Sequence, residues 1–368
     1  NVAVGLDALY ANTTGAENTA VGKNALAANT TGTENVAIGR NSLDANTTAN
    51  QNTAVGNSTL SVNTTGACNV AVGYRSLEAN TTAGGNTAVG FNSLLTNTTG
   101  GNNVAVGFCS LNANTTASDN TAIGVVSLLA TTTGSYNTAI GSGSMATNTT
   151  GEFNTATGVA ALKRNTTGTV STAVGYEALC ANTTGDNNTA VGYQALKLAT
   201  TSKFNVAMGN QALLANTTAC CSTAIGWRAV CSQTTGCKSV GIGYHALLKV
   251  TTGISNVALG DVAGDAITTG NQNVALGSAA IGSVTTGSNN VAIGQNSAGG
   301  GLITGSNNIT IGQNSGGDAM RSLASSSSNE IVMGNTNHTV AYIKIDWTVQ
   351  SDLRDKTEIK NVTHGLDF

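Results

Sequence analysis

The cysteine and histidine side chains are the groups in this chain that could bind a metal or act as nucleophiles. They are Cys68, Cys109, Cys180, Cys220, Cys221, Cys231, Cys237, His245, His338 and His364. No Cys-x-x-Cys pair occurs, and no histidine lies near one at a zinc-ligand spacing, so we expect no metal site. The number of cysteines is odd, which favours free thiols that act as small apolar residues in a reducing compartment.

Acidic and glycine-rich segments show no arrangement suited to catalysis or cofactor binding. Acidic residues such as Asp7, Glu17 and Glu34 do not recur as pairs with a fixed geometry. The run at 299–301 is three glycines without the lysine that follows in a phosphate-binding loop, so we interpret it as a plain loop. We therefore expect no cofactor and no enzymatic activity on other molecules.

Composition and charge exclude several further classes of protein. Charged residues make up 9% of the 368 residues and the net charge is −3, whereas a globular domain usually carries about 25% charged residues. No basic cluster predicts nucleic-acid binding, and no apolar run approaches the roughly 18 residues that insertion into a membrane requires. No signal peptide precedes Asn1, and Asn1 begins a repeat, so we expect the chain to be a piece of a longer protein.

An internal repeat of 17 residues sets the elements that must position any functional side chain. The segment Asn-Val-Ala-Val-Gly at 1–5 returns in closely similar form at 18–22 and 35–39. Its last residue is glycine in eighteen consecutive units, at Gly5, Gly22, Gly39, Gly56, Gly73, Gly90, Gly107, Gly124, Gly141, Gly158, Gly175, Gly192, Gly209, Gly226, Gly243, Gly260, Gly277 and Gly294. The spacing then loosens to Gly312 and Gly334. A fixed period predicts that each residue stacks on its counterpart in the next unit.

Each unit predicts one coil of an all-β, parallel β-solenoid (a β-roll). Numbered from Asn1, positions two to four form a short strand, and glycine at position five suits a turn with positive φ. The Asn-Thr-Thr-Gly segment is a second turn, in which asparagine bonds its own backbone and glycine is left-handed. We expect two strands and two turns per coil. Position four, aliphatic except at Thr157, and position nine, usually leucine, are the expected core. The apolar spacing excludes a helix.

The small side chains predict that several chains assemble together. One coil buries too little apolar surface to be stable alone, so stability comes from stacking. Eighteen coils about 4.8 Å apart would form a rod roughly 85 Å long. Position three is alanine except at Gly241, which indicates close packing there. We predict a parallel homotrimer with the alanine face toward the shared axis.

The 17-residue period also offers a structural explanation for the cysteine pair and for the repeated threonines. Cys220 and Cys237 are 17 residues apart, so we expect them on adjacent coils near bonding distance, and leave open whether they are bonded. Stacked threonines such as Thr13 and Thr30 could form an ice-binding ladder, but only one threonine of each pair would face outward. We regard ice binding as the less favoured alternative.

The Asn-Thr-Thr triplets match the pattern for N-glycosylation. They begin at Asn12, Asn29, Asn46, Asn63, Asn80, Asn97, Asn114, Asn148, Asn165, Asn182 and Asn216. Glycans on every coil would crowd at a spacing of about 5 Å, so we interpret the triplets as turns that carry a stacked asparagine ladder. Glycosylation stays an alternative for a eukaryotic host.

The Asn-x-Ala-(Val/Ile)-Gly units, over residues 1 to about 312, resemble the head repeats of trimeric autotransporter adhesins. That resemblance implies a left-handed parallel β-roll. The period here is longer because of the Asn-Thr-Thr segment, which leaves the handedness and the cross-section of the coil open.

The C-terminal segment carries a second resemblance. Residues 351–359 read Ser-Asp-Leu-Arg-Asp-Lys-Thr-Glu-Ile, and Gly-Leu-Asp-Phe follows at 365–368. This resembles the opening of the endosialidase-type intramolecular chaperone domain of phage tail spikes and fibres. The resemblance implies a domain that trimerises, templates folding of the fibre and then cuts itself off. It implies Ser351 as the nucleophile and Lys356 as its base, since a desolvated lysine can activate a hydroxyl. Only the start of such a domain is present.

These features divide the chain into three regions. Residues 1–312 are the expected solenoid shaft, 313–350 a degenerate repeat with a β cap or neck, and 351–368 the truncated start of the chaperone domain. Within the second region, 329–334 is the last degenerate unit, 339–345 predicts strands that close the solenoid, and Trp347 is expected to cover its core.

Together these observations predict a structural fibre protein of a virion, such as a phage tail fibre, whose trimeric shaft contributes to host-cell attachment. Expected partners are further copies of the chain, other virion proteins and a host-surface glycan. One alternative is the head of a bacterial trimeric adhesin at the cell surface, and a second is an extracellular structural filament. A one-time protease that cuts its own chain at Ser351 is a further hypothesis.

Overall fold

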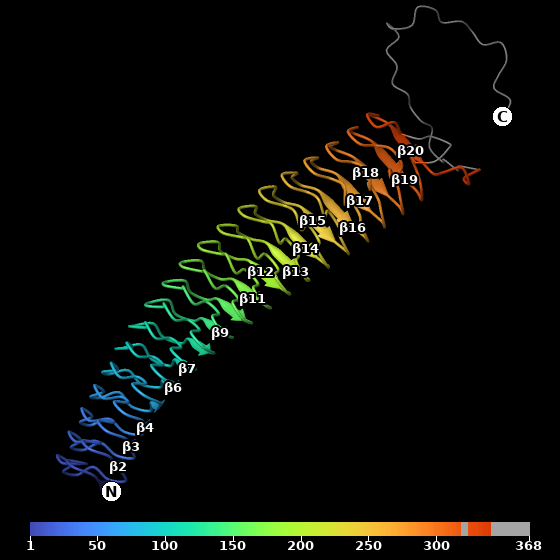
Figure 1. The fold of residues 1–368 in the computed structure, drawn as a ribbon. Coiled ribbons are helices and arrows are strands. Elements are labelled where there is room, and N and C mark those ends of the chain that lie inside the picture. Colours follow the sequence, from blue (N-terminus) through green and yellow to red (C-terminus); the bar gives the residue numbers. More distant parts are fainter. Residues whose placement is uncertain (318–322, 340–368) are drawn as a thin grey trace, which may run out of the picture.

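The structure is a computed structural model that describes residues 1–317 and 323–339, and it shows an elongated, gently curved rod (Figure 1). The described part contains twenty strands, each of them three residues long, and no helix. The strands are β1 (Val2–Val4), β2 (Thr19–Val21), β3 (Val36–Ile38), β4 (Thr53–Val55), β5 (Val70–Val72), β6 (Thr87–Val89), β7 (Val104–Val106), β8 (Thr121–Ile123), β9 (Thr138–Ile140), β10 (Thr155–Thr157), β11 (Thr172–Val174), β12 (Thr189–Val191), β13 (Val206–Met208), β14 (Thr223–Ile225), β15 (Val240–Ile242), β16 (Val257–Leu259), β17 (Val274–Leu276), β18 (Val291–Ile293), β19 (Ile309–Ile311) and β20 (Ile331–Met333). The predicted parallel β-solenoid of 17-residue coils is confirmed.

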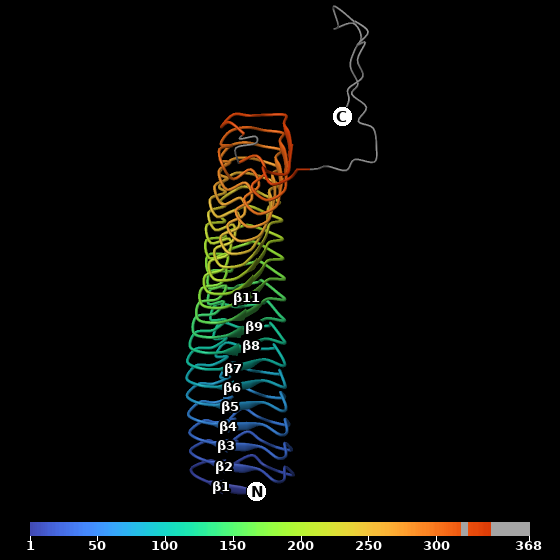
Figure 2. The same ribbon diagram turned by 90° about the vertical axis from the view of Figure 1, so that its right-hand side faces the viewer.

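Each strand pairs in parallel with the strand of the next coil, so the coils stack along the rod axis (Figure 2). The pairing offset is one repeat from β1 to β18. It becomes longer at β19, where Val291 pairs with Ile309, and again at β20, where Ile309 pairs with Ile331. The strands stay paired in parallel across both longer offsets. The segment 329–334, which contains β20, therefore continues the stack.

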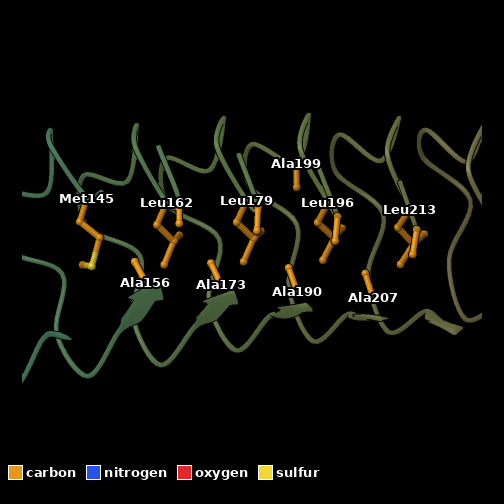
Figure 3. Packing of buried hydrophobic residues seen from close by; sticks show 14 of the residues in the cluster. Met145, Ala156, Leu162, Ala173, Leu179, Ala190, Leu196, Ala199, Ala207 and Leu213 are labelled. Carbon is orange, nitrogen blue, oxygen red and sulfur yellow. The ribbon is translucent and has the colours of Figure 1, made fainter. Parts of the chain in front are cut away.

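The core lies inside each coil and consists mainly of positions three and nine. Ala156 and Ala173 on the strands face Leu162 and Leu179 on the opposite side of the coil, and all four are fully buried (Figure 3). Met145 occupies the position of leucine in its own coil. Each buried leucine of this kind contributes roughly 1.5–3 kcal/mol. Identical contacts repeated from coil to coil hold the rod together.

The prediction that position four belongs to the core is wrong. Side chains alternate along a strand, so positions two and four point outward when position three points inward. Ile38 is 41% exposed and Ile225 is 37% exposed, whereas alanine at position three is buried. The coil is narrow: a Cβ on Gly241 would lie 2.5 Å from Cγ2 of Val230. The alanine face, expected toward a shared trimer axis, lies instead inside its own coil, so that prediction is wrong too.

Each coil contains one strand and not the two that the sequence predicted. The segment after the strand is a succession of turns and bends. Its backbone still bonds along the rod axis, since the amide of Leu26 donates to the carbonyl of Ser42 at 3.0 Å and that of Thr30 to Thr47 at 2.9 Å. Hydrogen bonds therefore join the coils on the side opposite the strands as well.

The turns follow the prediction at two positions and depart from it at a third. Glycine at position five has positive φ, +132° at Gly158, as expected. Asparagine at position 12 bonds its own turn, with Asn165 Nδ2 donating to the carbonyl of Gly168 at 2.9 Å. Gly168 itself is not left-handed. The left-handed residues are at positions 7, 9 and 17, and they include the buried Leu162 at φ +49°.

Candidate functional site

A buried asparagine column at position 12 runs along much of the rod. Asn165 Nδ2 donates to Asn148 Oδ1 at 2.8 Å, and Asn165 Oδ1 accepts from Asn182 Nδ2 at 2.8 Å. All three side chains are fully buried. The stacked ladder that we inferred from the Asn-Thr-Thr triplets is therefore confirmed here. The amide nitrogens that a glycan would occupy are already bonded inside the folded coil.

The column is interrupted where another residue replaces asparagine. Oδ1 of Asn114, Asn182 and Asn216 has no hydrogen-bond partner. The residues one coil further on are Thr131, Ala199 and Gln233, respectively. An unpaired buried carbonyl costs on the order of 1–3 kcal/mol, so each interruption weakens the stack locally.

A second asparagine column, at position one, is a feature that the sequence analysis did not predict. Asn18 Oδ1 accepts from the backbone amide of Asn35 at 3.0 Å, and Asn35 Nδ2 donates to the carbonyl of Ala49 at 2.8 Å. Each side chain thus joins the start of a strand to a neighbouring turn. The signal in the sequence is the recurrence of asparagine or serine before every strand up to β19.

Cys220 and Cys237 lie on adjacent coils, as their spacing predicted. Their Sγ atoms are 3.3 Å apart, and both thiols are free. The Cys220 thiol donates a hydrogen bond to Cys237 Sγ, and this bond raises the pKa of Cys220 to about 12. A disulfide requires a separation of about 2.0 Å, so the two sulfur atoms must move closer together to form one.

Oxidation is expected to join Cys220 to Cys237. The Cys237 thiolate attacks oxidised glutathione, and Cys220 then displaces the bound glutathione, so two thiols become one disulfide while two glutathiones are released. The bond closes a loop of one repeat and should stabilise the protein by about 3 kcal/mol. Mass spectrometry of the linked peptides, with urea unfolding before and after oxidation, measures both effects. Cys237→Ser is the control, and a lasting glutathione adduct or a Cys220–Cys221 bond would contradict the prediction.

The outward face of the strands carries an aliphatic stripe, which we define as the side chains at positions two and four of β1 to β20. Position two is valine, threonine or isoleucine, and position four is aliphatic except at Thr157. Many of these side chains are exposed, with Ile123 and Ile140 at 39% and Met208 at 43%. Large aliphatic residues are usually buried, which is why the sequence pattern favours a core at position four.

Exposed aromatic rings at position six flank the stripe. Phe91 stacks on Tyr74 and on Phe108, with ring centroids 5.3 and 5.4 Å apart, and Trp227 stacks on Tyr244 at 4.9 Å. Such pairs contribute about 0.5–1.5 kcal/mol beyond the burial of area. The rings extend the apolar surface from the strand into the following turn.

The remaining predicted site residues do not belong to the asparagine columns, the cysteine pair, the stripe or the aromatic rings. Ser351, Lys356 and Trp347 fall outside the described residues, as do all but the first residue of the strands expected at 339–345. Within 1–317 and 323–339, no group of three or more His, Cys, Asp or Glu side chains could hold a metal ion. The same residues include no helix long and apolar enough to cross a membrane.

No protein-family model matches the chain, and the search of curated proteins found no match.

Proposed function

We propose that the chain is the shaft of a homotrimeric fibre on a virion, most simply the tail fibre of a phage. The observation that carries this proposal is the aliphatic stripe. Soluble monomers rarely expose apolar patches larger than a few hundred Å². A stripe that runs from β1 to β20 without a charged residue therefore supports burial against another molecule.

The most suitable partner for the stripe is a second copy of the same chain. A partner must present apolar groups at the spacing of one coil over the whole rod, and an identical parallel chain does so. A threefold ring uses two different patches on each chain, one for each neighbour. The stripe and the flanking position-six aromatics supply two such patches on adjoining parts of the coil.

The resemblance of residues 351–368 to the start of a chaperone domain supports the assignment to a virion, with processing next to Ser351. In that role the rod would act as a rigid spacer and would contribute to host-cell attachment together with other virion proteins. Mass spectrometry of purified particles tests this part, and absence of the chain from virions would reject it. The adhesin alternative predicts that the full gene continues into a coiled-coil stalk and a membrane anchor.

Charges placed on the stripe are expected to separate the chains. Ile123→Arg with Ile140→Arg puts two desolvated charges into the proposed interface and should convert a trimer into monomers at micromolar concentration. Thr133→Arg with Thr150→Arg adds the same charges at exposed positions of the same two coils and should leave the trimer intact. Sedimentation equilibrium measures the mass. A wild-type monomer or dimer, or equal effects of both variants, would refute the threefold packing.

A further inference from the structure

A surface cavity of about 260 Å³ lies on three consecutive coils in the middle of the rod. Its lining includes Lys163, Arg164, Glu177, Cys180 and Lys197. The volume lies just below the range of about 300–1,000 Å³ that is usual for small-molecule pockets, so it suits a small ligand.

The cavity exists because small residues interrupt columns of large ones. At position ten, Cys180 lies between Lys163 and Lys197 on the neighbouring coils. At position 11, Ala181 lies between Arg164 and Leu198 in the same way. In a solenoid with strict register, a short side chain between two long ones leaves a hollow that the backbone cannot close.

The charges around the hollow are unbalanced. Lys197 Nζ bonds Glu177 Oε2 at 2.7 Å, which lowers the pKa of Glu177 and raises that of Lys197. Gln194 donates a second bond to the same oxygen at 2.8 Å. Lys163 and Arg164 form no ion pair with the described residues. Three cations therefore surround one neutralised carboxylate in a chain whose net charge is −3.

We propose that this hollow binds the carboxylate of a small ligand. Lys163 and Arg164 supply the unpaired cations, and an arginine can hold both carboxylate oxygens at once. Lys197 is oriented by Glu177, and Leu198 and Ala181 offer apolar contact to the rest of the ligand. The carboxylate could belong to an acidic sugar or to an acidic amino-acid side chain. The lining residues occupy positions 7, 10 and 11 and include no residue of the stripe or of position six.

Cys180 provides a direct reporter of the site. Burial raises the pKa of its thiol most strongly, Glu177 adds to the rise, and Lys163, Arg164 and Lys197 oppose it, which places all four charges near the sulfur. Iodoacetate and iodoacetamide both alkylate the thiolate with loss of iodide and differ in charge. The ratio of their rates at one cysteine therefore cancels the fraction of thiolate and reports the local preference for a carboxylate.

We expect the iodoacetate-to-iodoacetamide ratio at Cys180 to exceed that at Cys109 by about 3- to 10-fold at low salt. Cys109 is a suitable reference because burial alone raises the pKa of its thiol. Lys163→Gln with Arg164→Gln should bring the two ratios together, while Lys23→Gln with Arg40→Gln removes the same charge elsewhere and should not. Peptide mass spectrometry of the native protein gives each rate. Equal ratios in the wild type, or failure of either reagent to reach Cys180, would overturn the proposal.

Protection of Cys180 from iodoacetamide distinguishes the two sources of the carboxylate. Glucuronate is compared with glucose, and N-acetylglutamate with N-acetylglutamine. Protection by glucuronate alone assigns the site to acidic sugars, by N-acetylglutamate alone to acidic side chains, and by both to the carboxylate group itself. Absence of protection by either acid, or equal protection by its neutral partner, would overturn it.

Discussion

Alanine in place of Gly158 is expected to destabilise the rod by about 3–5 kcal/mol, one of the two largest effects that we predict for a single substitution. The backbone at Gly158 has φ +132°, which side chains rarely adopt. A Cβ there would lie 2.5 Å from the carbonyl oxygen of Gly175 and 2.7 Å from its carbon. Because both atoms are backbone of the next coil, the two coils must move apart.

Urea unfolding followed by circular dichroism measures the loss, and hydrogen exchange should place it in the coils that contain Gly158 and its neighbours. Gly143→Asn is the matched control. Gly143 has φ +65° and open space within 4 Å of the point where a Cβ would lie, and Asn24 and Asn92 occupy the same position at φ +60° and +52°. The control should be neutral or slightly stabilising. Equal unfolding midpoints for Gly158→Ala and the wild type would contradict the stacking geometry.

Aspartate in place of Asn165 is expected to cost a similar amount at neutral pH. The substitution turns a donor into an acceptor opposite two oxygens, Asn148 Oδ1 at 2.8 Å and the carbonyl of Gly168 at 2.9 Å. It also buries a carboxylate without a cation, which costs several kcal/mol and raises the folded-state pKa of that carboxyl. Asn187→Asp makes the same chemical change at an exposed site and should have little effect.

The cost of Asn165→Asp should depend on pH in a defined direction. The carboxyl titrates near about 3.9 in the unfolded chain and at a higher pH in the folded one. Below the unfolded value both states are protonated, so the charge penalty is absent. The penalty grows as the pH rises above that value and levels off above the folded pKa. Stability of the variant relative to Asn187→Asp should therefore improve from pH 7 to pH 4, and a flat difference would contradict burial of the ladder.

The period and the strand positions could be predicted from the sequence because strict register makes similar residues recur every 17 positions. Glycine at position five and the proximity of Cys220 and Cys237 followed from the same 17-residue spacing. Which face of the strand lies inside could not be predicted correctly, because a three-residue strand offers one side chain to one face and two to the other. Hydrophobicity alone places the larger side chains of the strand in the core, whereas the narrow coil favours alanine at position three, which is replaced in the described strands by Gly241, Thr310 and Val332.

Two other features, the backbone conformation at position nine and the cavity beside Cys180, could not be predicted from the sequence of a single repeat. Leucine at position nine adopts positive φ, a conformation that costs an ordinary residue on the order of 1–2 kcal/mol and that no sequence signal marks. The cavity beside Cys180 needs three coils in register, with long side chains on the outer two and short ones between them. A consensus sequence of the repeat does not reveal such a site, because the residues that form it differ from the residue types most common at their positions.

The pairing of each coil with only its immediate neighbours has a genetic consequence. Unequal recombination between repeats can add or remove whole coils, and every remaining junction keeps the same contacts. The longer offsets at β19 and β20 show that additional residues between two strands do not prevent the strands from pairing. A lineage that carries such a gene can therefore adjust the reach of its rod in single steps, without having to redesign a core.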